Sequence, residues 1–167
     1  ITKFIKDDPD IDVVGIGKHS SNEKVQHIID DGLSVYVPKD KIDNFKNYDI
    51  SGSIESVLDD CDLVIDASPG GNGFVNKKNI YEPKGIKAIF QGGETIFNDK
   101  SVADILFNSR VNYAEAFDKN YVMQGSCNVT GMGRILNPLR EKYSDKLSRF
   151  DATLIRRWAD LEQTDKQ

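Results

Sequence analysis

The chain has 167 residues, enough for one ordinary domain or for one domain and the start of another. Hydrophobic residues make up 38% of it and charged residues 29%, which is the balance of a folded globular protein rather than a disordered one. The net charge of −5 comes with scattered basic residues, which argues against nucleic-acid binding, and no apolar run reaches the roughly 20 residues that a membrane helix needs.

Short apolar runs rich in β-branched residues alternate with helical patterns along most of the chain. The predicted strands are 12–16, 34–37, 62–67, 87–91 and 121–126. Helices are predicted at 23–31, 41–45, 53–59, 73–81, 101–107 and 128–142, and an alternating strand is predicted at 150–158. This order is typical of βαβ units, so we expect an α/β fold with a doubly wound, mainly parallel sheet that leads into the beginning of another domain.

A cysteine follows the last strand of the predicted sheet. The strand runs into Ser126-Cys127-Asn128, and a helix then begins. Ligands bind at the carboxyl edge of open α/β sheets, and the unpaired N–H groups at a helix start favour a thiolate over a thiol. The alternative is a small buried cysteine that packs at a strand end, which is how we interpret Cys61. Two cysteines are too few for a disulfide framework or a zinc site, and no metal is expected.

The segment 126–131, Ser-Cys-Asn-Val-Thr-Gly, resembles the Ser-Cys-Asn-Thr-Thr-Gly segment of archaeal-type phosphorylating glyceraldehyde-3-phosphate dehydrogenases, with Val129 in place of Thr. Three further stretches look like the same family in the same order, at 66–71, at 84–94, and at 155–157 with 159–160, although Trp158 departs from the family; 107–113 is similar as well. A lone Ser-Cys-Asn segment is weak evidence for this family, but four collinear motifs are strong evidence. The resemblance covers nearly the whole chain and about half of a full-length family member.

For the architecture, the resemblance implies a Rossmann-like sheet whose first βα unit is missing, followed by the start of an α+β catalytic domain. The dinucleotide-binding domain is expected at 1–126 and the beginning of the catalytic domain at 127–167. Both are expected to be incomplete, since the chain opens with Ile1 and trails off after an apolar run. Family habit implies a homotetramer, and the reduced cysteines fit a cytoplasmic protein.

For the chemistry, the resemblance implies oxidation of D-glyceraldehyde 3-phosphate to 1,3-bisphosphoglycerate with NAD(P)+ and inorganic phosphate. Cys127 is the nucleophile that forms a thiohemiacetal and then a thioester. Ser126 and Asn128 flank the substrate, and Asn128 also contacts the cofactor. Arg156 and Arg157 carry guanidinium groups that suit phosphate, and Arg157 is also assigned to the cofactor. The alternative interpretation is that Arg156 and Arg157 are an exposed pair without a functional role.

The cofactor signals favour NADP. No complete Gly-x-Gly-x-x-Gly turn is present, because Gly15-Ile16-Gly17 lacks its third glycine. The strand before Lys18 ends without the carboxylate that holds the ribose of NAD, and a lysine suits a 2′-phosphate instead, so we expect NADP to be preferred and NAD to be accepted. Lys18 can also be a solvated loop residue. The resemblance assigns the backbone of Gly93 to a position beside the cofactor, whereas Glu94 is expected to cap or pair locally.

The general base is expected outside the chain. His19 and His27 are the only histidines, and neither lies where the base belongs. The family histidine comes from beyond residue 167, so we expect no dehydrogenase activity from the chain alone. Two other functions stay open: another cysteine-dependent semialdehyde dehydrogenase, and a noncatalytic Rossmann module that binds a nucleotide or senses redox state through Cys127.

Overall fold

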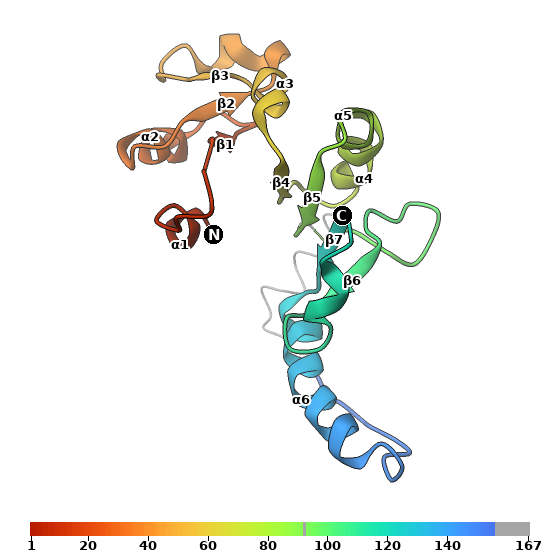
Figure 1. Cartoon of the computed structure of the whole chain (residues 1–167). Coiled ribbons are helices and arrows are strands. Elements are labelled where there is room, and N and C mark those ends of the chain that lie inside the picture. The colour runs from red at the N-terminus through yellow and green to blue at the C-terminus, as the bar shows by residue number, and fades with distance from the viewer. Residues whose placement is uncertain (92, 156–167) are drawn as a thin grey trace.

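The computed structural model describes residues 1–91 and 93–155 (Figure 1). The helices are α1 (Thr2–Ile5), α2 (Glu23–Asp30), α3 (Ile54–Val57), α4 (Asn72–Asn76), α5 (Glu82–Lys84) and α6 (Cys127–Tyr143). The strands are β1 (Ile16–Gly17), β2 (Val35–Val37), β3 (Gly52–Ser53), β4 (Leu63–Asp66), β5 (Lys87–Phe90), β6 (Ile105–Phe107) and β7 (Tyr121–Gln124). Short 3-10 helices cover Lys39–Phe45, Leu58–Asp60 and Tyr113–Ala116, and a π-helical turn, Lys77–Tyr81, joins α4 to α5.

The strands form two sheets in which every pairing is parallel. The first sheet has the order β1-β2-β3 and the second has the order β4-β5-β7-β6. Helices lie between most consecutive strands, as parallel pairing requires, because a parallel neighbour can be reached only by a crossover. The prediction of an α/β fold with a Rossmann-like parallel sheet is confirmed.

Within the described residues the strands form two sheets rather than one continuous sheet. β1 pairs only with β2 and β4 pairs only with β5, so each has one edge without a partner among these residues. Figure 1 shows the two sheets as separate groups of strands. In a doubly wound sheet of strand order 3-2-1-4-5-6, strand 1 lies between strands 2 and 4. Strands 2 and 4 of that order correspond to β1 and β4 here.

Each sheet has its own apolar core, built by helices with one apolar face. In the first sheet, α2 begins at Asn22, whose side-chain oxygen accepts a hydrogen bond from Lys24 N at 3.1 Å, and it ends before Gly32, which has a φ of +75°. Its Val25 is fully buried in this core. The two cores consist of Val25, Val35, Val37 and Phe45, and of Leu58, Tyr81, Ile86, Ala88, Phe90, Val102 and Ala103.

Three sequence predictions were wrong in detail. The segment 101–107 is not a helix, because Ile105–Phe107 is strand β6, paired with β7 at Ile105↔Val122. The strand predicted at 12–16 is formed only at its end, as β1. The strand predicted at 150–158 is absent over residues 150–155, and the rest of it lies outside the described residues.

Helix α6 extends away from the second sheet (Figure 1). None of its residues is buried, and Ile135 is 62% exposed. Its first turn stays against the sheet, where it follows β7 directly. Among the described residues, no helix is long and apolar enough to cross a membrane.

Candidate active site

Cys127 is the first residue of α6 and is exposed. The strand β7 ends at Gln124, and Gly125 and Ser126 connect it to the helix. Ser126 is the N-cap, with its Oγ accepting a hydrogen bond from Val129 N at 3.3 Å. Cys127 therefore lies exposed at a helix N-terminus on the carboxyl edge of a parallel sheet.

The start of α6 is held against the strand by close contacts. Thr130 Oγ1 donates to the Gly125 carbonyl oxygen at 3.2 Å, and Thr130 N donates to the Ser126 carbonyl oxygen at 2.8 Å. A Cβ at Gly125 would lie 3.0 Å from Val129 Cγ1, so a larger residue here would require the Val129 side chain to shift. These contacts fix the direction in which the helix leaves the sheet and hence the place of Cys127.

The loop after β6 packs on the same helix. Asn108 is buried, and its Nδ2 donates to the Thr130 carbonyl oxygen at 3.1 Å. Its backbone N–H donates to Asn112 Oδ1 at 2.9 Å. A Cβ at Gly133 would lie 2.6 Å from Asn108 Nδ2, so the glycine permits this close approach. The loop and α6 thus form one unit beside Cys127.

A buried carboxylate organises the carboxyl end of β4. Asp66 is 6% exposed and accepts hydrogen bonds from Asn76 Nδ2 at 2.9 Å, from Tyr81 Oη at 2.8 Å, and from the backbone N–H and the hydroxyl of Ser68. Burial alone would raise the pKa of this carboxyl, but the hydrogen bonds from Asn76, Ser68 and Tyr81 outweigh it and hold the pKa below its usual value. Burial and the Asp66 charge raise the pKa of Tyr81, so its hydroxyl stays a donor.

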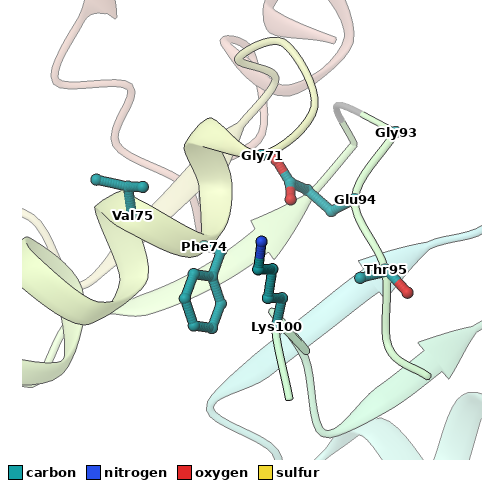
Figure 2. Close-up of a pocket in the computed structure, with 7 residues that line it drawn as sticks. All are labelled: Gly71, Phe74, Val75, Gly93, Glu94, Thr95 and Lys100. Carbon is teal, nitrogen blue, oxygen red and sulfur yellow. The ribbon is translucent and has the colours of Figure 1, made fainter. Parts of the chain in front are cut away.

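A second carboxylate joins the loops after β4 and β5. Glu94 Oε1 accepts a hydrogen bond from Gly73 N in the first turn of α4 at 2.8 Å, which confirms that Glu94 caps locally. A Cβ at Gly73 would lie 2.9 Å from both Glu94 Oε1 and Phe90 Cδ1. Figure 2 shows the Glu94 carboxylate directed toward the start of α4, near Gly71. Asp66 and Glu94 together set the shape of the β4–α4 turn.

The same loops line a hollow of about 420 Å³. Its walls include Gly71, Phe74, Gly93 and Lys100, and the Lys100 side chain reaches into it beside Phe74 (Figure 2). Gly71 and Gly93 have φ values of +87° and +77°, and nothing lies within 4 Å of a Cβ built at either. The backbone at these two glycines is therefore open to a close ligand.

The structure brings some of the predicted site residues together. Ser126, Cys127 and Asn128 lie at one helix start, and Gly93 follows β5, which is the direct neighbour of β7. Lys18 follows β1 in the other sheet, where its backbone N–H donates to the Tyr36 carbonyl oxygen at 2.8 Å and its side chain is half-buried.

Other predicted features lie apart from this site or outside the described residues. His19 and His27 are exposed. Arg156 and Arg157 lie outside the described residues. Within 1–91 and 93–155, no group of three or more histidine, cysteine or acidic side chains is placed to hold a metal ion.

Sequence reasoning missed the side chains that shape the site rather than react in it. The Asp66 network joins residues 10 and 15 positions apart through Asn76 and Tyr81, and Asn108 meets Thr130 across 22 positions. No local pattern connects such pairs. One signal was available: an aspartate that ends an apolar strand and precedes a glycine-rich turn is placed to accept hydrogen bonds from that turn.

Comparison with curated proteins identifies the relatives of the chain. It is 39% identical over 168 residues to a glyceraldehyde-3-phosphate dehydrogenase of Sulfolobus acidocaldarius, an alignment that covers 99% of this chain and 47% of the relative. Proteins of the same name from Halobacterium salinarum and Methanococcoides burtonii are 38% and 37% identical, over 95% and 90% of the chain. The chain is homologous to archaeal glyceraldehyde-3-phosphate dehydrogenases. No family model matches it.

The chain spans about half the length of the curated relatives that it matches, which are covered to 44–47% in these three alignments. Because the alignment with the Sulfolobus glyceraldehyde-3-phosphate dehydrogenase takes in 99% of the chain, the Ser126-Cys127-Asn128 segment lies within the shared region. The resemblance stated from the motifs is confirmed.

Proposed function

We propose that the protein containing this chain is a phosphorylating, NAD(P)-dependent glyceraldehyde-3-phosphate dehydrogenase in which Cys127 is the nucleophile. The observation that carries the proposal is the position of an exposed cysteine as the first residue of α6, directly after a parallel strand. Relatives of this name match the chain over nearly its whole length, and they support an oxidoreductase function.

In the proposed reaction, a base takes the thiol proton, and Cys127 Sγ attacks the aldehyde carbon of D-glyceraldehyde 3-phosphate. A carbon–sulfur bond forms as the carbonyl electrons move to oxygen, which takes the proton back from the base to give a thiohemiacetal. The carbon then loses a hydride and the oxygen loses its proton to a base, which leaves a thioester on Cys127. An oxygen of inorganic phosphate attacks the thioester, and the carbon–sulfur bond breaks to return the thiolate and release 1,3-bisphosphoglycerate. A nicotinamide dinucleotide, when bound, supplies the hydride acceptor.

The residues beside Cys127 have supporting roles in this proposal. Ser126 and Asn128 flank the substrate, and the Asn128 amide is a donor suited to the oxyanion and to the nicotinamide. Arg156 and Arg157 bind phosphate groups, with Arg157 also on the cofactor.

The open backbone at Gly71 and Gly93 fits a dinucleotide that approaches the carboxyl edge of the sheet. Lys18 follows β1 at the same kind of edge and can meet a 2′-phosphate, so the proposed preference is NADP, with NAD also accepted. The division of the chain at residues 126 and 127, a homotetrameric assembly and a cytoplasmic location complete the proposal.

Replacement of Cys127 tests the proposal. In the complete protein, Cys127→Ser is expected to lower the rate of aldehyde oxidation by on the order of a thousandfold or more, since a hydroxyl is a far weaker nucleophile at neutral pH. Cys61→Ser is the matched control, because Cys61 is half-buried and its Sγ donates to the Val57 carbonyl oxygen at 3.2 Å. Wild-type turnover by Cys127→Ser would exclude the proposed mechanism.

A further inference from the structure

Lys100 brings a positive charge to the hollow between α4 and the loop after β5. Its side chain reaches into the hollow beside Phe74 (Figure 2). Within residues 1–91 and 93–155, Lys100 forms no ion pair with a carboxylate. Glu94 lines the same hollow, but its Oε1 accepts the hydrogen bond from Gly73 N at 2.8 Å. The Lys100 ammonium group is therefore available to an anion that enters the hollow.

The loop that carries Lys100 is closed by a hydrogen bond between its two ends. Val102 is fully buried, and its backbone N–H donates to the Thr95 carbonyl oxygen at 3.0 Å. Within the loop, Asn98 Oδ1 accepts a hydrogen bond from Lys100 N at 2.9 Å, and the Asn98 carbonyl oxygen accepts one from Ser101 N at 3.0 Å. The backbone of Lys100 is thus held in place before a ligand arrives, which lowers the entropic cost of binding.

A second lysine, Lys77, fastens this loop to the sheet. Lys77 is 7% exposed, and its Nζ donates to the Ser101 carbonyl oxygen at 3.4 Å and lies 4.5 Å from the centre of the Tyr121 ring. A cation over an aromatic ring is a favourable contact. Tyr121 is the first residue of β7, the strand that leads to Cys127. Lys77 therefore holds the Lys100 loop against the strand that positions the cysteine.

The hollow lies at the edge of the sheet where ligands of open α/β folds bind. Gly71 follows β4 and Gly93 follows β5, so both glycines lie at the carboxyl ends of parallel neighbours. The open backbone at these glycines lets a ligand approach closely, and the Phe74 ring offers an apolar surface to a ribose or a base. The only anionic groups that NAD+ and NADP+ share are the two phosphates of the diphosphate, and an ammonium group suits them.

We propose that Lys100 binds the diphosphate shared by NAD+ and NADP+ and so strengthens the binding of both dinucleotides. This inference rests on the proposed function, because it assigns a residue to the dinucleotide site of that reaction. It differs from the role proposed for Lys18, which concerns the 2′-phosphate of NADP+ alone. Neither the motifs nor the cofactor signals in the sequence singled out Lys100.

Calorimetric titration of the complete protein with NAD+ and with NADP+, at constant ionic strength, tests the inference. Lys100→Met removes the charge and keeps an unbranched side chain. It should raise the Kd of both dinucleotides about tenfold, the effect of losing one charge-assisted hydrogen bond. Lys100→Arg keeps the charge and should stay within about threefold of the wild type. Lys119→Met is the matched control and should leave both Kd values unchanged, because the exposed Lys119 precedes β7 and so lies at the opposite, amino edge of the sheet.

Three results would overturn the inference. Unchanged Kd values in Lys100→Met, or a rise that Lys119→Met shares, would exclude a specific contact. A rise for NADP+ alone would show that Lys100 meets the 2′-phosphate rather than the diphosphate. Binding and turnover by the wild type decide the proposed function separately. A wild type that oxidises the aldehyde, together with an unaffected Lys100→Met, refutes the Lys100 contact alone, whereas a wild type that binds neither dinucleotide refutes the proposed function as well.

Discussion

Removal of the Tyr81 hydroxyl should destabilise the protein because this group donates to a buried carboxylate. Tyr81 is 5% exposed, and its Oη lies 2.8 Å from Asp66 Oδ2. Tyr81→Phe keeps the ring, which lies 6.2 Å from the Phe90 ring between centroids, so no cavity opens. The loss is one charge-assisted hydrogen bond, and we expect the free energy of unfolding to fall by about 2 kcal/mol.

Urea unfolding followed by circular dichroism measures this loss. Tyr48→Phe is the matched control: its ring packs 6.4 Å from that of Phe45, and its hydroxyl has no hydrogen bond with the rest of the described chain. The control should change the free energy of unfolding by less than about 0.5 kcal/mol. Equal losses in the two variants would refute the reasoning.

The loss should also depend on pH. The folded pKa of Asp66 lies below its unfolded value of about 3.9, so its contribution to stability is complete above about pH 5 and disappears as the pH falls through the folded pKa. The difference between Tyr81→Phe and wild type should therefore be full at pH 7 and shrink toward about pH 3. A difference that stays constant over this range would show that the Asp66 charge is not involved.

Three further changes have expected outcomes. Gly133→Ala should be less stable than Gly131→Ala by about 1–3 kcal/mol in urea unfolding. The reason is that a Cβ at Gly133 would meet Asn108 Nδ2 at 2.6 Å, whereas nothing lies within 4 Å of a Cβ at Gly131. Equal stabilities of the two variants would contradict the packing of the loop on α6. Ser126→Ala removes the N-cap of α6 and should lower the free energy of unfolding by about 1 kcal/mol in the same measurement. An unchanged free energy of unfolding would contradict a stabilising role of this cap. Lys18→Ala should raise the KM for NADP+ about tenfold and that for NAD+ less than about twofold, and equal effects in steady-state kinetics would count against a 2′-phosphate contact.

The sequence predicted the fold class well because strand–helix alternation depends on local patterns. Helix α2 begins after Asn22 and ends before Gly32, as these capping residues predict. Ser53 caps α3 by accepting a hydrogen bond from Ser56 N at 3.1 Å. The strand Ile105–Phe107 was mistaken for part of a helix because three residues carry no periodicity. Its conformation is set by pairing with β7, a tertiary contact that a local pattern does not contain.

The position of Cys127 in the fold was predictable because the features that determine it lie in one segment. Cys127 follows a strand and opens a helix, and both features can be read from the surrounding residues. The contact between Arg110 and α6 could not be read in this way, because Asn137 Nδ2 meets the Arg110 carbonyl oxygen across 27 positions. Tyr81 meets Asp66 across 15 positions, from the end of a π-helical turn, and no local pattern connects the two residues.

Mass spectrometry of the trapped acyl-enzyme tests the central claim most directly. The complete protein is mixed with D-glyceraldehyde 3-phosphate and NADP+ without inorganic phosphate, quenched in acid and digested. A 3-phosphoglyceroyl group on the peptide that carries Cys127, released when inorganic phosphate is added before the quench, is the predicted result. Reduction of NADP+ by the protein with an unmodified Cys127 peptide, or with the acyl group on Cys61 instead, would contradict the account.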